Sequence, residues 1–114
     1  MLTANTDLKA IYAMNEFGIV GASRALMEKS IDTIKVYGFD FSNDVLPLLE
    51  SGVCTGTMVQ KPYDMGYVGV QSLNAYLDGD TVEKSIDSGC VLVTPENYKE
   101  EDIYNVLYPM GNEQ

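Results

Sequence analysis

Residues 34–60 read IKVYGFDFSNDVLPLLESGVCTGTMVQ and hold two short apolar runs on either side of a helical stretch. The first run, residues 34–38, and the second, residues 53–59, are rich in β-branched residues and predict two strands. Between them a short helix is expected to run through Glu50 and to stop at Gly52, which follows it directly. A strand, a helix and a strand of these lengths predict one unit of an open α/β sheet.

The same alternation continues in both directions along the chain. Upstream, residues 8–14 (LKAIYAM) predict a strand and residues 17–30 a helix. Downstream, a helix is expected over residues 62–77, a last strand over residues 88–94 (SGCVLVT) and a helical turn over residues 102–107. The order β-α-β-α-β-α-β predicts the α/β class, with a Rossmann-like parallel open sheet and right-handed crossovers.

Charge and apolar content exclude two classes of partner. The chain has 114 residues, the length of one domain, and its 7 Lys and Arg against 17 Asp and Glu leave a net charge of −10. Such a surface repels phosphate backbones and anionic lipid, so we expect no nucleic-acid partner. The apolar runs are much shorter than the roughly 18 residues that a membrane span requires, so we expect no membrane insertion.

The residue types that most often carry catalysis or bind metals are scarce. Histidine is absent, which removes the commonest general base and the commonest metal ligand. Cys54 and Cys90 lie far apart, without the CxxC spacing of zinc or dithiol sites. We expect both thiols to be small buried side chains, with a disulfide between them as the alternative. We therefore expect no catalytic residues, no metal and no cofactor, and a small α/β enzyme is the least favoured function.

Polar side chains follow three of the predicted strands. Asn15 follows the first strand, Asp40 the second and Gln60 the third. Ligands of open α/β sheets bind outside the carboxyl ends of the strands, so these three side chains are expected at one rim. A carboxylate beside two amides suits a neutral polyhydroxyl ligand, whereas phosphate favours Gly-rich N–H cradles or cationic side chains. The alternative is that Asn15 and Asp40 are helix caps and Gln60 is a loop residue.

Aromatic residues accompany this rim. Phe39 and Phe41 flank Asp40, and we expect them to contact a ligand, with plain packing as the alternative. Tyr12 and Tyr37 lie within predicted strands, and we expect them to pack in the core or at a sheet edge.

Three segments that carry these residues resemble the type I periplasmic sugar-binding family, to which the ribose-binding and galactose-binding proteins belong. They read DLKAIYAMNEFGIVGASRAL (7–26), IKVYGFDFSNDVLPLLESG (34–52) and VCTGTMVQKPYDMGYVGVQSL (53–73). The resemblance implies a fold of two lobes that clamp a sugar between them. It also implies that Asn15, Asp40 and Gln60 contact the sugar hydroxyls.

The resemblance further implies a division of the chain. Residues 1–60 would form a βαβαβ unit of the C-terminal lobe, and residues 61–86 a hinge crossing and a helix that belong to the N-terminal lobe. Residues 87–114 would form the returning hinge strand and an acidic tail. Since most of the N-terminal lobe has no counterpart here, we expect a C-terminal fragment. We also expect this fragment to form homo-oligomers, because the helix over residues 62–77 has an apolar stripe that the missing lobe would cover.

The function that the resemblance implies is that of a solute-binding receptor of an ABC-type sugar importer. Such a receptor binds a monosaccharide-like ligand without catalysis and passes it to the ABC permease, so its location is extracytoplasmic, in the periplasm or on a cell-surface lipoprotein. The main alternative is the sugar-sensing domain of a LacI-type transcription regulator or a sensor kinase. GFDFS (38–42) and LESGVCTG (49–56) depart from the GFDD stretch and proline-rich loop of the repressors, which favours transport. Glu16 and Phe17 depart from the usual aspartate and polar residue of the family.

Overall fold

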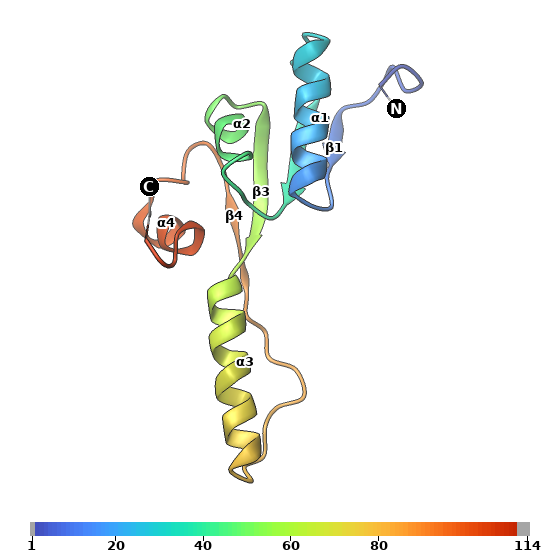
Figure 1. Ribbon diagram of the computed structural model, residues 1–114. Coiled ribbons are helices and arrows are strands. Elements are labelled where there is room, and N and C mark those ends of the chain that lie inside the picture. The colour runs from blue at the N-terminus through green and yellow to red at the C-terminus, as the bar shows by residue number, and fades with distance from the viewer. Residues whose placement is uncertain (1, 112–114) are drawn as a thin grey trace.

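The computed structural model describes residues 2–111. The order of strands and helices that the sequence predicts is confirmed, and α3 begins and ends at the predicted residues (Figure 1). Most of the other boundaries differ by one to a few residues from the expected ones. The elements are β1 (Ala10–Tyr12), α1 (Glu16–Glu28), β2 (Lys35–Phe39), α2 (Leu46–Glu50), β3 (Cys54–Gln60), α3 (Pro62–Leu77), β4 (Cys90–Val93) and α4 (Glu101–Leu107).

The four strands form one open sheet in the order β1-β2-β3-β4. β1, β2 and β3 are parallel, whereas β4 runs antiparallel to β3, with Gln60 opposite Cys90 and Thr57 opposite Val93. The prediction of a parallel sheet is therefore wrong for the last strand, and the sheet is mixed. The reason lies in α3, which continues beyond the end of β3 instead of packing back on the sheet, so the chain returns to β3 from its carboxyl end (Figure 1).

The hydrophobic core joins the sheet to its helices. α1 packs against β2, and α2 packs against β3. Gly38 in β2 permits the closest approach of α1, because a Cβ atom there would lie 2.1 Å from Cγ1 of Ile19. The buried apolar residues form one cluster: Ala13, Ile19, Leu26, Val36, Val45, Leu48, Leu49, Cys54, Val59 and Val93.

The short helix α2 ends at Glu50, as its sequence predicts, but it begins only at Leu46 and has no side-chain cap. Pro47 lies in its first turn, where the missing N–H group would have no partner within the helix. Gly52 follows the helix with a φ of 73°, a left-handed conformation that favours glycine. The chain therefore turns from α2 into β3 within a few residues.

One face of the sheet is exposed, and Tyr12 and Tyr37 belong to it. Successive right-handed crossovers between neighbouring strands place α1 and α2 on the same face. The strand register aligns Tyr12 with Tyr37, Phe39 with Met58, and Met58 with Leu92. We call these five residues the exposed sheet face, because Tyr12, Tyr37 and Leu92 are exposed and the other two are half-buried. Core packing, one of the two alternatives predicted for these tyrosines, is therefore wrong, and of the two only Tyr12 lies in an edge strand, β1.

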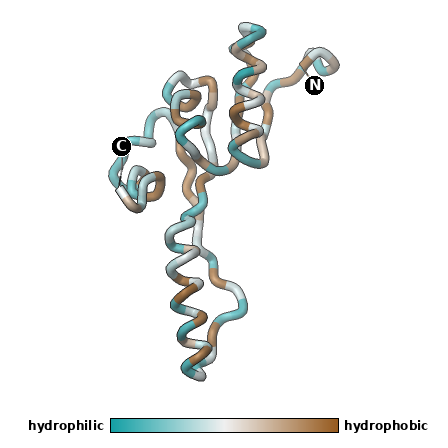
Figure 2. The backbone as a smooth tube through the Cα atoms, in the orientation of Figure 1, coloured by the Kyte–Doolittle hydropathy of each residue, from teal (hydrophilic) through white to brown (hydrophobic). Residues whose placement is uncertain are grey.

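α3 extends away from the sheet as an arm (Figure 1). None of its residues, all of which the structure describes, is buried. Hydrophobic residues nevertheless occur along its length, as Figure 2 shows. The Cα radius of gyration is 17.7 Å, compared with about 13 Å for a compact domain of this length. The molecule is therefore elongated, and α3 leaves apolar surface in water.

The two thiols lie in different surroundings. Cys54 is buried at the start of β3, where burial raises the pKa of its thiol and a hydrogen bond with the backbone of Gly56 lowers it to a smaller extent. Cys90 is exposed, so the prediction that both thiols are buried is wrong for Cys90, which lies where β4 joins the arm. Cys90 pairs with Gln60 at the far end of β3, about 20 Å along the strand from Cys54. A disulfide within one chain requires Cα atoms within about 7 Å, so these two cysteines cannot pair.

Candidate functional site

Asp40 and Gln60 meet at the rim where β2 and β3 end. Nε2 of Gln60 donates a hydrogen bond to Oδ1 of Asp40 at 2.9 Å. Both side chains are half-buried, so each keeps polar surface that faces solvent. The structure thus brings together two of the three residues that the sequence places at this rim.

Both polar groups of the Asp40 backbone form hydrogen bonds with residues of β3. Its N–H group donates to the carbonyl oxygen of Met58 at 2.8 Å, and its own carbonyl oxygen accepts from Oγ1 of Thr57 at 2.7 Å. Between these bonds Asp40 has a φ of 75°, a left-handed conformation that residues other than glycine seldom adopt. Such a conformation persists where the surroundings enforce it, and it is common at functional sites. The direction of the carboxylate is therefore set by β3 as well as by β2.

Asn15 caps α1. Its Oδ1 atom accepts a hydrogen bond from the N–H group of Gly18 at 2.9 Å, and its backbone is extended, as is usual for the residue before a helix. Asn15 therefore has the helix-capping role that the sequence analysis gave as the alternative to ligand binding. Because this bond uses only the carbonyl oxygen of the amide, the exposed NH2 group can still donate to a ligand.

A hollow of about 240 Å³ opens beside Asp40 and Gln60. Glu16, in the first turn of α1, also lines it, together with Phe41 and the start of α3. The polar groups among these described residues are two carboxylates and one amide, so the hollow offers chiefly hydrogen-bond acceptors. Its volume is below the roughly 300 Å³ at which pockets begin to enclose a small-molecule ligand. The arrangement therefore suits one side of a hydroxyl-rich ligand.

Glu16 is a lining residue that the sequence reasoning did not select. Its position directly after Asn15 was the available signal, since both residues follow β1 at the same rim. Asn15 itself is not among the residues that line this hollow, although its neighbour is. Two carboxylates and an amide thus line the hollow, and Asn15 directly precedes one of the lining residues in the sequence.

The two rim aromatics differ in their surroundings. Phe41 lines the hollow and also makes an edge-to-face contact with Tyr108, with ring centroids 5.9 Å apart. Phe39 lies in β2, opposite Met58 on the exposed sheet face, and it does not line the hollow. Phe41 is therefore the aromatic residue whose position suits a ligand contact, while Phe39 belongs to the sheet.

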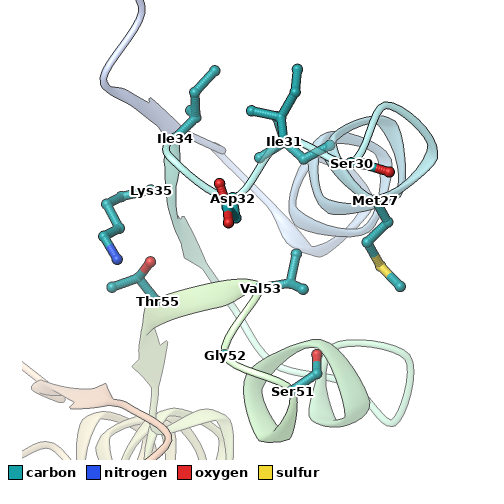
Figure 3. Close-up of a pocket in the computed structure, with 11 residues that line it drawn as sticks. Met27, Ser30, Ile31, Asp32, Ile34, Lys35, Ser51, Gly52, Val53 and Thr55 are labelled. Carbon is teal, nitrogen blue, oxygen red and sulfur yellow. The ribbon is translucent and has the colours of Figure 1, made fainter.

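A larger hollow of about 420 Å³ lies at the opposite end of the strands, where β2 and β3 begin (Figure 3). Met27, Ile34 and Val53 line it beside the charged side chains of Asp32 and Lys35. It includes none of the site residues that the sequence predicts, and ligands of open α/β sheets bind at the other end of the strands. We therefore place the candidate site at the Asp40–Gln60 rim.

Two further properties concern the described part of the chain as a whole. Within residues 2–111, no group of three His, Cys, Asp or Glu side chains could hold a metal ion. Over the same residues, no helix combines the length and the apolar character needed to cross a membrane.

Comparison with known proteins places the chain in a family. Residues 1–81 match the family model described as a periplasmic binding protein domain. The ribose import binding protein of Escherichia coli (strain K12) is 32% identical over 83 residues, which are 73% of this chain and 28% of that protein. The chain therefore belongs to the periplasmic binding protein family, and the resemblance seen in the three sequence segments is confirmed. It spans little more than a quarter of the length of this relative.

Solved structures of sugar-bound proteins share the fold. An ABC transporter solute binding protein from Agrobacterium vitis with bound D-fucose has a TM-score of 0.85 and 38% identity, over 94% of this chain and 37% of that one. A carbohydrate transporter solute binding protein from Agrobacterium radiobacter, in complex with D-arabinose, also has a TM-score of 0.85, with 36% identity over 93% of this chain and 36% of that one. The fold prediction is confirmed in its α/β class, in its open sheet and in its likeness to binding proteins of this family.

Proposed function

From this family membership we propose that the chain forms part of the solute-binding receptor of an ABC-type sugar importer. It supplies one wall of a site for a monosaccharide-like ligand, and it acts by binding alone. The observation that carries the proposal is the hydrogen-bonded pair of Asp40 and Gln60 at the carboxyl ends of two parallel strands. The import and transporter functions in the names of the related proteins support transport rather than transcriptional regulation.

The chemistry of the wall matches sugar hydroxyls. The carboxylate of Asp40 can accept from two neighbouring hydroxyl groups of a sugar, since it has lone pairs beyond the one that Gln60 uses. Gln60 orients this carboxylate through its NH2 group and keeps its own carbonyl oxygen as a further acceptor. The NH2 group of Asn15 supplies a donor for a hydroxyl oxygen. Hydrogen bonds to a charged acceptor are the stronger kind, about 1.5–3 kcal/mol each, so Asp40 is the central residue.

The groups that the wall offers support binding without catalysis. Glu16 and Asp40 are the two carboxylates at the hollow, and a glycosidase would need one of them kept protonated by deep burial. Both are only half-buried. We propose that they act as hydrogen-bond acceptors rather than as an acid–base pair.

We propose that a second lobe of the protein completes the binding site. We propose that residues 1–60 belong to one lobe, that residues 61–86 cross to the other lobe, and that residues 87–114 form the returning hinge strand and an acidic tail. The antiparallel pairing of β3 with β4 and the outward direction of α3 support this division (Figure 1). The closed site would lie between the lobes, its location would be extracytoplasmic, and its partner would be the ABC permease.

Amide-resolved NMR tests this proposal on the chain itself. We expect D-fucose or D-arabinose at high millimolar concentration to shift the side-chain amide signals of Asn15 and Gln60 and the backbone signal of Asp40. The affinity should be low because a single wall leaves the ligand half in water. Shifts that cluster instead around Asp32 and Lys35 at the other end of the strands would contradict the site, and the absence of any shift would contradict sugar binding by this wall.

A further inference from the structure

The last helix, α4, is attached to the part of the molecule that carries the candidate site. It packs against β3 (Figure 1). Three of its apolar residues are half-buried against the hydrophobic core: Ile103, Val106 and Leu107. Ahead of the helix, the hydroxyl group of Tyr98 donates a hydrogen bond at 2.8 Å to Oε1 of Glu50, the last residue of α2. Apolar contacts and a hydrogen bond thus hold the segment that ends in α4.

Tyr108 directly follows α4 and contacts a residue of the rim. Its backbone N–H group donates to the carbonyl oxygen of Tyr104 at 2.9 Å, so the last turn of the helix sets its position. The ring of Tyr108 lies 4.9 Å from that of Tyr104, measured between centroids. It also meets the ring of Phe41 edge to face, at 5.9 Å and an interplanar angle of 90°. Aromatic pairs favour this geometry, so the contact stabilises one position of the Phe41 ring.

Phe41 belongs to both this aromatic pair and the candidate site. It follows Asp40 in the sequence and lines the hollow beside Asp40 and Gln60. Phe41 lies beyond the end of β2, so the pairing of β2 with β3 does not fix its ring. The contact with Tyr108 is therefore the described interaction that orients the ring at the hollow.

The end of α4 also borders the start of α3. Val106 and Pro109 line a hollow of about 240 Å³ together with Lys61 and Pro62. Pro62 lines the hollow beside Asp40 as well. Tyr108 thus lies in a segment whose neighbouring residues reach the same part of the molecule as Phe41 does.

We propose that Tyr108 is a positioning residue of the sugar wall, which holds the ring of Phe41 at the hollow so that this ring packs on the apolar face of the ligand. The inference rests on the proposed function, because it concerns the same hollow. Each side chain that becomes immobile on binding lowers the affinity, and a ring that is already held avoids this cost. The edge-to-face contact depends on the ring of Tyr108 and not on its hydroxyl group, so phenylalanine at this position should act equally well.

Aromatic NMR on the full chain tests the first step without a ligand. The chain has three phenylalanines, so the ¹³C-labelled ring signals of Phe41 can be assigned. We expect nuclear Overhauser contacts between Phe41 and Tyr108 in the unchanged chain. Tyr108→Ala should move the Phe41 ring signals towards those of a freely rotating side chain, whereas Tyr108→Phe should leave them in place. Unmoved Phe41 signals in Tyr108→Ala would overturn the proposal, because other residues would then hold the ring.

Titration with D-fucose, followed through the side-chain amide signals of Gln60, tests the second step on the same chains. We expect Tyr108→Ala to bind about 2-fold to 10-fold more weakly, the effect of immobilising one side chain. Tyr108→Phe should restore the affinity of the unchanged chain. Tyr98→Ala is the matched control, because it removes a ring from the same segment that is bonded to Glu50 and not paired with Phe41. It should lower the free energy of unfolding and leave the affinity unchanged.

The unchanged chain separates the failure of this inference from that of the proposed function. If D-fucose shifts no signal of the unchanged chain, the proposed function fails and the role of Tyr108 fails with it. If the unchanged chain binds D-fucose and Tyr108→Ala binds it equally well, only the role of Tyr108 is overturned. An equal loss of affinity in Tyr98→Ala also overturns this role, because attachment of α4 would then explain both losses. Far-UV circular dichroism confirms that each variant is folded, and Tyr108→Leu replaces Tyr108→Ala if the latter unfolds.

Discussion

Gln60 donates a hydrogen bond to Asp40 at 2.9 Å although the two residues are 20 positions apart in the sequence. The parallel pairing of β2 with β3 brings them together, because each residue lies at the carboxyl end of its own strand. The contact therefore depends on strand register and not on local sequence. A side chain that is oriented before the ligand arrives loses less entropy on binding.

We expect this pair to dominate sugar affinity in a two-lobe protein that carries these residues, such as a relative in which residues 7–93 replace the matching segment. Asp40→Ala should abolish binding, because the hydroxyls it accepts from would lose their partner in an enclosed site. Gln60→Ala should cost about 1–3 kcal/mol, roughly a 5-fold to 150-fold loss of affinity. Titration calorimetry with the cognate sugar measures both changes.

Lys35→Ala is the matched control for this series. Lys35 lines the hollow at the opposite end of the strands (Figure 3), so its loss should leave sugar affinity unchanged. Unchanged affinity in the Asp40→Ala protein would show that the site lies elsewhere.

Substitutions at Asp40 can show how its positive φ affects stability, separately from the role of its side chain in binding. Glycine adopts this conformation without strain, whereas alanine has a cost of about 1–2 kcal/mol and no side chain that can reach Gln60. We expect Asp40→Gly to match or exceed the unchanged chain in its free energy of unfolding, and Asp40→Ala to fall below Asp40→Gly. Urea denaturation measures this order. Equal stability of the two variants would mean that the backbone of residue 40 is not strained.

The sequence predicted those features of the fold that depend on local pattern. The β-branched runs and the proline at the start of α3 predicted the element order, since periodicity and helix capping are local properties. The pattern of strands and helices missed the direction of β4, because a helix that follows a strand usually packs back on the sheet. A returning strand within residues 87–114 was implied only by the family resemblance.

Burial was predicted less well, for a related reason. The exposure of Tyr12, Tyr37 and Cys90 depends on which surfaces the rest of the chain covers, and a strand pattern cannot show this. The meeting of Asp40 and Gln60 at one rim could be predicted, because ligands of open α/β sheets bind outside the carboxyl ends of the strands and polar side chains are therefore sought there. Glu16 was not selected as a site residue, because a carboxylate in the first turn of a helix is common without any ligand.

Gly38 is predicted to be essential for packing rather than for the site. A Cβ atom at this position would lie 2.1 Å from Cγ1 of Ile19, which is fully buried in α1 and cannot move away freely. We expect Gly38→Ala to lower the free energy of unfolding by about 1–3 kcal/mol or more, as overpacking does. Gly21→Ala is the control, because a Cβ at this exposed helical position meets nothing within 4 Å. It should raise stability by about 0.5–1 kcal/mol, and a loss comparable to that of Gly38→Ala would contradict the packing argument.

Asn15 is predicted to have two separable roles, one for each end of its amide. Its Oδ1 atom caps α1 through Gly18, and its NH2 group is the end that can reach a sugar. Aspartate keeps a capping oxygen but has no NH2 group, whereas alanine has neither. We therefore expect Asn15→Asp to keep the stability of the unchanged chain and Asn15→Ala to lose about 1 kcal/mol in urea denaturation. In the two-lobe protein both variants should lose affinity, because a ligand contact depends on the NH2 group and not on the cap. If Asn15→Asp instead binds sugar as tightly as the unchanged protein, Asn15 acts at this rim only as a helix cap.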